Sequence, residues 1–399
     1  MILYFNPGHE TAVKNASPYY TAPANVVAMQ KELSFLPAWY GERGDVVLVD
    51  SENFDSEYYK QIRSLFSYLP SPLCEEELHD CRTAEISLWG ISPQAIYYFN
   101  ELCHKYDCNL KTPKWDDRYT ALNSRITARE CLISLKAEVA AIADDIVPSF
   151  YTDMEQIEEA VNQSTCRLLS KAPYSSSGRG LLWLPESGLT RTERQILHGI
   201  LKKQGCVSVE KALNKDIDFA MEFVSDGAGT VSFAGYSLFY TNIKGGYDSN
   251  YIGAQESIVR LLTNKISPEL LSEIKEKLRD VLQAKFANIY KGCIGVDMMV
   301  YKDEDVYKIH PCVEINMRYN MGYLSLRLSE KYISQTSEGR FAIRFSAKND
   351  EIYSQHSEMQ QQHPLSFDQE GKIEKGYLPL CAIGKTSTYW AYILVEKSK

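Results

Sequence analysis

The chain has 399 residues and a formal net charge of −9, with 44% hydrophobic and 24% charged residues. This length exceeds what one hydrophobic core usually organises, so two or three subdomains are expected. The negative charge argues against a nucleic-acid or membrane-surface partner, because phosphate-dense surfaces would repel the chain, while a local basic pocket for a nucleotide stays compatible with it.

The cysteines and the N-terminal residues indicate a soluble, cytoplasmic protein. The ten cysteines form no pair of CxxC motifs, which argues against a structural zinc site and favours reduced thiols. Residues 1–7 lack a basic n-region, as a signal peptide would require. No apolar run approaches the roughly 20 residues that a membrane-spanning helix needs.

Residues 1–125 alternate between short apolar strands and helical segments, in the pattern of a small α/β domain. Strands are expected at residues 2–5, 46–49 and 86–89, and a helix is expected from Pro93 to about residue 103, with Ser92 as its N-cap. Loops at the carboxyl ends of such strands carry ligand contacts in α/β domains, so the loops after these strands are candidate ligand contacts.

A polar loop, residues 173–180, lies between two apolar strands at 166–170 and 181–184, and Lys171 ends the first strand. Phosphates need a dense array of N–H and hydroxyl donors, which this serine- and glycine-rich loop can supply, and a lysine adds a compact positive charge. No lysine follows the final glycine, so the loop is not a Walker loop, and the strand that follows argues against a dinucleotide fingerprint. The alternative is a flexible surface hairpin.

The next strand, residues 207–213, carries Glu210, and Asp218 follows shortly after it. An acid beside exposed strand backbone can accept a hydrogen bond from an adenine amino group, and a second acid can hold ribose hydroxyls. Solvated charges at strand ends are the simpler alternative.

Two later strands, residues 293–301 and 306–316, follow a strand at 230–240 and a long amphipathic helix at 268–289. They carry Asp297, Glu314 and Asn316, of which the last two project to the same side because strand residues alternate between faces. Two carboxylates and an amide are hard oxygen ligands suited to magnesium. A surface strand with solvated polar residues is the alternative. Two further strands are expected in the tail, at 376–383 and 388–395.

These segments, in this order, resemble the ATP-grasp superfamily from about residue 123 to residue 322. Residues 147–150 (Val-Pro-Ser-Phe) resemble the start of the first lid strand, and Glu314-Ile315-Asn316-Met317-Arg318 resembles the E-x-N-x-R signature. The resemblance implies an α/β fold with a small N-terminal pre-ATP-grasp domain and two α+β lid subdomains. The implied ranges are residues 1–122, 123–206 (small lid), 207–335 (large subdomain with the metal site) and 336–399, a C-terminal extension with a strand pair that the family pattern does not explain.

The resemblance also implies the roles of individual residues. Nucleotide contacts fall on Arg125, Lys171, Ser175, Ser176, Ser177, Gly178, Glu210, Leu213, Asp218 and Met299, the last beneath the adenine ring. Metal ligands are Asp297, Glu314 and Asn316, for magnesium or manganese, and the catalytic residues are Lys171 and Arg318. Substrate contacts are expected at His9, Glu10, Lys244 and Tyr247.

Three features depart from the family pattern. Arg125 stands where a lysine is usual, Gly295 stands where several relatives carry arginine, and 17 residues separate Asp297 from Glu314, more than in many relatives. Either the two strands are extended or residues 310–312 form a bulge, which a proline in a ladder favours. Misaligned strands would remove Asp297 from the metal site.

The function implied by the resemblance is an ATP- and magnesium-dependent ligase that activates a carboxylate as an acyl phosphate for condensation with an amine. The expected partners are small-molecule carboxylates and amines, with an amino acid or a peptide-like compound as substrate. A homodimer is one option that the sequence leaves open. The alternatives are a degenerate ATP-binding regulatory or scaffold protein, and an ATP-grasp carboxylase or phosphotransferase.

Overall fold

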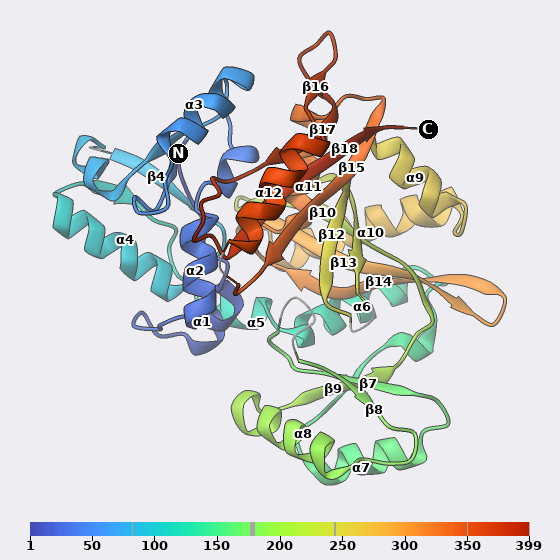
Figure 1. Cartoon of the computed structure of the whole chain (residues 1–399). Coiled ribbons are helices and arrows are strands. Elements are labelled where there is room, and N and C mark those ends of the chain that lie inside the picture. The colour runs from blue at the N-terminus through green and yellow to red at the C-terminus, as the bar shows by residue number, and fades with distance from the viewer. Residues whose placement is uncertain (82, 176–179, 243–244, 349, 399) are drawn as a thin grey trace. The chain divides into compact units, whose positions relative to one another are not determined.

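A computed structural model of the chain describes residues 1–81, 83–175, 180–242, 245–348 and 350–398 (Figure 1). By their internal contacts the residues form two compact units. Unit 1 consists of Met1–Asp116, Asp248–Gln255 and Arg318–Lys399, and unit 2 of Asp117–Tyr247 and Glu256–Met317. The four ranges expected from the sequence stay predictions, because these two units are defined by packing and do not follow those ranges.

Unit 1 begins with a parallel five-stranded sheet in the order β3-β2-β1-β4-β5. Its central strand β1 is buried along its whole length, as expected for a parallel strand covered on both faces. The strands are β1 (Ile2–Tyr4), β2 (Val46–Leu48), β3 (Ser71–Leu73), β4 (Thr83–Leu88) and β5 (Asn109–Lys111). The helices are α1 (His9–Asn15), α2 (Ala24–Glu32), α3 (Ser56–Leu65) and α4 (Pro93–Tyr106), with 3₁₀ turns at Leu36–Trp39 and Glu75–Asp80. The predicted cap of α4 is confirmed, since the Ser92 hydroxyl accepts a hydrogen bond from the Ala95 N–H.

The rest of unit 1 is an antiparallel run of strands, β12-β15-β18-β17-β16. They span β12 (Tyr247–Ile252), β15 (Ser337–Phe345), β18 (Tyr389–Lys397), β17 (Ile373–Pro379) and β16 (Ser366–Phe367), with helices α11 (Met321–Tyr332) and α12 (Glu351–Gln362). One hydrophobic core combines Trp39 and Phe66 with Tyr332, Phe341 and Ile393. The C-terminal segment therefore packs on the N-terminal domain.

Unit 2 contains a four-stranded sheet in the order β6-β9-β7-β8. Its strands are β6 (Ser149–Tyr151), β7 (Leu168–Lys171), β8 (Leu181–Leu184) and β9 (Val207–Lys211). Two helices, α7 (Met154–Gln163) and α8 (Arg191–Gln204), cover one face of this sheet (Figure 1) and share a core with it through Ile157, Leu197 and Val209. Helix α8 has defined ends, because Thr190 and Glu193 form a capping box and Gly205 takes a left-handed conformation.

The second part of unit 2 is the antiparallel order β14-β13-β10-β11. Its strands are β10 (Lys215–Asp226), β11 (Val231–Thr241), β13 (Lys291–Asp303) and β14 (Val306–Asn316). The helices are α5 (Arg118–Leu122), α6 (Arg125–Glu138), α9 (Gln255–Thr263) and α10 (Pro268–Phe286), with a 3₁₀ turn at Asp144–Ile146. Side chains of β13 alternate, so that Val296 and Met298 are buried while Asp297 and Met299 are half-buried on the opposite face.

No helix among the residues that the structure describes is long and apolar enough to cross a membrane. All ten cysteines are free thiols.

Candidate nucleotide and metal site

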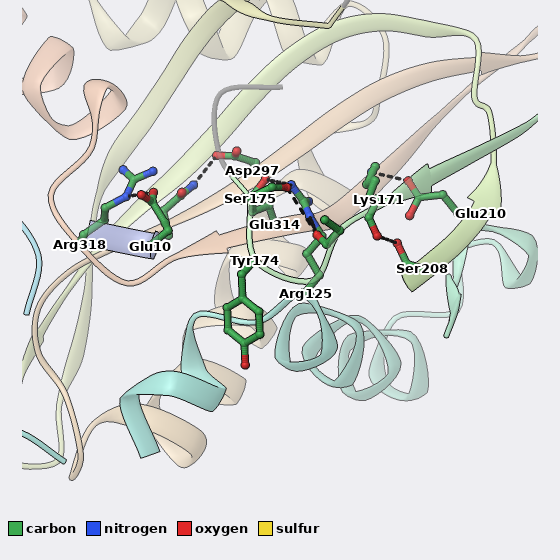
Figure 2. Close-up of polar contacts among 12 residues, drawn as sticks. Glu10, Arg125, Lys171, Tyr174, Ser175, Ser208, Glu210, Asp297, Glu314 and Arg318 are labelled. Carbon is green, nitrogen blue, oxygen red and sulfur yellow. Dashed lines mark hydrogen bonds and ion pairs between the residues drawn. The ribbon is translucent and has the colours of Figure 1, made fainter. Parts of the chain in front are cut away.

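The two acids of the predicted metal site lie directly opposite each other in unit 2. Asp297 on β13 pairs in register with Glu314 on β14, and Gly295 pairs with Asn316. The Asn316 amide donates a hydrogen bond to Asp297, with Nδ2 3.1 Å from Oδ1 (Figure 2). Opposite residues of an antiparallel ladder project to the same side, so the three side chains face one another.

A bulge explains the long spacing between these two acids. The register shifts between Asp297 and Met299, because Met299 pairs with His310 while Asp297 pairs with Glu314. Residues 311–313 of β14 thus face the single residue Met298. Of the two alternatives raised by the sequence, the bulge is the one found, and Asp297 keeps its place beside Glu314.

The donors of this set fit a magnesium ion that arrives with a nucleotide. Magnesium is commonly held by one or two carboxylates together with substrate phosphates and water. Among the residues described, no group of three or more His, Cys, Asp or Glu side chains could hold a metal by itself. Asp297, Glu314 and Asn316 would therefore provide the protein side of the coordination, and phosphates and water the remainder.

Arg125 connects this acid set to the start of the predicted phosphate loop. It is buried at the beginning of α6, after the N-cap Ser124. Its Nη2 lies 2.6 Å from Oε2 of Glu314, and its Nε donates to the carbonyl oxygen of Ala172 at 3.2 Å (Figure 2). The same Nη2 lies 3.5 Å from the Ser175 hydroxyl, at the outer limit of a hydrogen bond.

Lys171, the predicted phosphate lysine, forms an ion pair with Glu210 (Figure 2). The pair follows from the β7–β9 register, in which Lys171 lies opposite Ser208 and Leu169 opposite Glu210. The side chains are 6% and 13% exposed, so the charges neutralise each other away from bulk water. Glu210 was expected to accept from an adenine amino group, and in this structure its carboxylate faces the lysine.

The loop that follows Lys171 is closed at its base. The Ala172 N–H donates to the Gly180 carbonyl at 3.1 Å, and Gly180 has φ +85° with Ser175 and Ala172 packed against it, which requires glycine. The Gln204 side chain makes two hydrogen bonds to the Tyr174 backbone. Its Oε1 accepts from the Tyr174 N–H, and its Nε2 donates to the Tyr174 carbonyl oxygen. The predicted contacts Ser176, Ser177 and Gly178, and Lys244 in a later loop, lie outside the described residues.

Two of the predicted base and ribose residues, Asp218 and Met299, form a row with His310 across three strands. Asp218 on β10 pairs with Met299 on β13, and Met299 pairs with His310 on β14. Asp218 accepts a hydrogen bond from the Thr241 hydroxyl at 2.9 Å and forms an ion pair with Lys215. Leu213 lies between β9 and β10, where its carbonyl oxygen accepts from the Lys215 N–H at 3.0 Å.

His310 is a residue of this face that the sequence did not single out. It is 4% exposed, and its Nδ1 accepts a hydrogen bond from the Cys312 N–H at 3.4 Å. Burial lowers the pKa of His310 to about 4, while Glu210 and Lys171 act on it in opposite directions. The signal that would have identified it is its spacing of four residues before Glu314, which becomes meaningful only once the bulge is known.

The predicted residues of unit 1 form a separate group. Arg318 donates from Nε to Oε1 of Glu10 at 2.5 Å (Figure 2), and the Tyr319 N–H donates to the Trp89 carbonyl at the end of β4. Burial by itself would raise the pKa of Glu10, but the charge of Arg318, together with smaller contributions, lowers it overall. Tyr247, another predicted substrate contact, belongs to unit 2 and is half-buried at the start of β12.

His9 is buried against Gly90 and is not exposed to solvent. Its Nε2 lies 3.1 Å from the Ile91 carbonyl oxygen, and a Cβ on Gly90 would come within 2.3 Å of its ring. Burial lowers the pKa of His9 to about 4. Nδ1 of His9 is buried without a hydrogen-bond partner among the described residues.

Comparison with known proteins gives a likeness of fold. No protein-family model matches the sequence, and no curated protein matches it. A biotin carboxylase from Campylobacter jejuni, solved as a β-γ-ATP complex, matches with 12% identity and a TM-score of 0.54, over 100% of this chain and 88% of that one. The biotin carboxylase domain of Hydrogenobacter thermophilus 2-oxoglutarate carboxylase, with MgADP, ADP and bicarbonate, matches with 12% identity and a TM-score of 0.50, over 98% and 85%.

The chain therefore has the fold of the ATP-grasp superfamily. The predicted mixed α/β architecture is confirmed.

Proposed function

We propose that the protein is an ATP- and magnesium-dependent ligase that activates a carboxylate as an acyl phosphate for attack by an amine. The observation that carries this proposal is the hydrogen-bonded set in unit 2. There Arg125 connects Glu314 to Ala172 at the base of the loop, and Asn316 connects to Asp297 across from Glu314. Cations and acids of this kind are what a magnesium–triphosphate complex requires.

Each group has a role that its chemistry supports. Lys171 and Ser175 would bind phosphate oxygens, together with the loop residues that follow. Asp297, Glu314 and Asn316 would hold magnesium, which when bound neutralises charge on the transferred phosphoryl group. Phosphoryl transfer depends mainly on positioning and charge stabilisation, so these residues need no covalent chemistry.

In the base pocket, Met299 would lie beneath the adenine ring, with Glu210 and Leu213 along its edge, and Asp218 would hold the ribose. In unit 1, Arg318 would bind the substrate carboxylate with its planar guanidinium. His9 and Glu10, with Lys244 and Tyr247, are the proposed substrate contacts. The buried position of His9 favours an indirect role, in which it supports the loop that carries Glu10.

A second candidate is an ATP-dependent carboxylation. Both solved structures described above are biotin carboxylases, and one of them contains bicarbonate. Bicarbonate would accept the phosphoryl group as any carboxylate does, so the same residues would serve. A degenerate scaffold is disfavoured because Lys171, Asp297, Glu314, Asn316 and Arg318 are all present.

Two measurements test the proposal. ATP with magnesium should raise the melting temperature of the full chain, because a ligand at a hundred times its Kd stabilises the folded state by about 2.7 kcal/mol. Phosphate release should then be measured across amino acids, short peptides and bicarbonate, each with and without an amine. An amine-dependent product identifies a ligase, and turnover with bicarbonate identifies the carboxylation.

The Glu314→Gln variant provides the control, since it keeps the size of the side chain and removes one charge of the metal set. It should lose substrate-dependent phosphate release by a factor of about 100 or more. Turnover close to that of the unmodified protein in Glu314→Gln, or no stabilisation by ATP with magnesium, would contradict the proposal.

A further inference from the structure

We propose that Arg125 occupies the place of the metal ion at Glu314 until nucleotide binds, so that magnesium is accepted only together with ATP. This inference rests on the proposed nucleotide and metal site and adds to it an order of assembly. Arg125 then has two positions, one on the metal carboxylate and one on the phosphates.

The contacts of Arg125 carry this inference. Its Nη2 lies 2.6 Å from Oε2 of Glu314, the carboxylate assigned to the metal. Its Nε is held by the Ala172 carbonyl at 3.2 Å, one residue after the phosphate lysine. The residue is 9% exposed, so solvent contributes little to screening the ion pair. In this state the charge of Glu314 is already neutralised.

A second cation at the same carboxylate is disfavoured. A divalent ion bound to Glu314 would lie beside the guanidinium, and two cations in a partly buried site repel each other strongly. The nucleotide phosphates remove this conflict, because they bring the negative charge that both cations need. Magnesium alone is thus excluded, whereas magnesium with nucleotide is accepted, which is a positive coupling between the two ligands.

The side chain at position 125 suits this exchange because it is an arginine. A guanidinium presents several donors in a fixed plane, and here different nitrogens serve Ala172 and Glu314 together. A lysine would have to reach both acceptors from a single nitrogen atom, whereas the arginine uses two nitrogens. Lys171, the other cation assigned to the phosphates, is likewise paired with an acid, Glu210.

The test measures metal binding to the full chain without nucleotide, with Mn²⁺ as the probe and titration calorimetry or electron paramagnetic resonance as the readout. Arg125→Met should bind Mn²⁺ more tightly than the unmodified protein by a factor of about ten, because Glu314 is then free to coordinate. The same variant should bind ADP with magnesium more weakly by a factor of about ten. Opposite changes in the two affinities are the signature of the exchange.

Two further variants make the result decisive. Arg129→Met is the matched control, one turn along α6, where the arginine donates to the Pro148 carbonyl at 2.8 Å; it should change neither affinity. Arg125→Lys keeps the positive charge, and it replaces Arg125→Met in the Mn²⁺ measurement if that variant does not fold. It should bind Mn²⁺ without nucleotide about fivefold more tightly than the unmodified protein.

Two outcomes separate this inference from the proposed function. If the unmodified protein binds ADP with magnesium but both Arg125 variants bind Mn²⁺ as it does, the exchange is wrong and the nucleotide site stands. If the unmodified protein binds no ADP, the proposed function fails, and the exchange fails with it.

Discussion

Arg318 and Glu10 are 308 residues apart in the sequence, and their side chains form an ion pair at 2.5 Å within unit 1. Each side chain is 15% exposed. The family resemblance predicted Glu10 as a substrate contact and Arg318 as a catalytic residue, and it did not predict that they pair. Their contact means that a change at either residue affects the other.

Glu10→Gln should destabilise the protein by about 3 kcal/mol at pH 7, because it leaves a buried guanidinium without its counter-charge. The pKa of Glu10 is lowered in the folded chain. Its stabilising contribution is therefore fully present above the ordinary value of 4.5 and is lost as the pH falls below it. Urea unfolding at pH 7 and pH 3 measures both effects. A variant as stable as the unmodified protein at pH 7 would contradict the assignment.

The buried pair Lys171–Glu210 predicts a difference between single and double variants. Lys171→Met should cost about 3–5 kcal/mol of unfolding free energy, since Glu210 becomes a buried charge without a partner. The double variant with Glu210→Gln should recover most of that stability. Nucleotide binding should stay weak in both, because the phosphate lysine is absent. If the double variant also recovers ATP affinity, Lys171 does not bind phosphate.

Two buried histidines predict a loss of stability in mild acid. The pKa values of His9 and His310 are both lowered to about 4, mainly by burial. Below the ordinary value of 6.5 the unfolded chain binds protons that the folded chain does not, so stability falls from pH 6.5 to pH 4. Each histidine contributes up to about 1.4 kcal/mol per pH unit.

Chemical unfolding between pH 4 and pH 7 tests this. His310→Gln should reduce the slope of the unfolding free energy against pH by nearly 1.4 kcal/mol per pH unit, which corresponds to the uptake of about one proton on unfolding. His104→Gln, at an exposed position on α4, is the control. An unchanged slope in His310→Gln would show that this histidine is not held neutral in the folded protein.

Gly90 should not tolerate a side chain. A methyl group there would meet three atoms of His9 at 2.3 to 2.7 Å, so Gly90→Ala should cost about 1–3 kcal/mol and lower turnover by moving the adjacent Glu10. Gly199→Ala on α8 is the matched control, because nothing lies within 4 Å of the added group, and alanine there should stabilise the helix slightly. Thermal unfolding and phosphate release distinguish the two, and equal stability of both variants would contradict the packing described.

The sequence predicted the acids and cations of the candidate site but not how they pair. Lys171 beside its polar loop, and Asp297, Glu314 and Asn316 on two apolar strands, each stand in a short local pattern, and their order along the chain carries the family resemblance. The partners Glu210 for Lys171 and Arg125 for Glu314 depend on the β7–β9 register and on where α6 begins against β14. Such contacts between distant segments leave no local signal.

The fold shows the same contrast between single elements, which were predicted, and their packing, which was not. Strands β13 and β14 were predicted within a few residues, because both are runs rich in apolar residues separated by the polar turn at residues 302–305. The packing of the C-terminal strands into the core with Trp39 and Phe66 was not predicted. A hydrophobic strand shows that it is buried, but not which other segment buries it.

Because of the bulge at residues 311–313, the side of the sheet to which Glu314 points depends on whether the number of extra residues in β14 is even or odd. The bulge adds two residues, so His310 and Glu314 still point to the same side as Met299 and Asp297. Deleting one residue there would turn Glu314 and Asn316 towards the buried face of the sheet, whereas deleting two would leave a regular ladder with both on their present side. Relatives of this chain should thus differ by even numbers of residues between the two acids, and loss of a single codon there should be more damaging than loss of two.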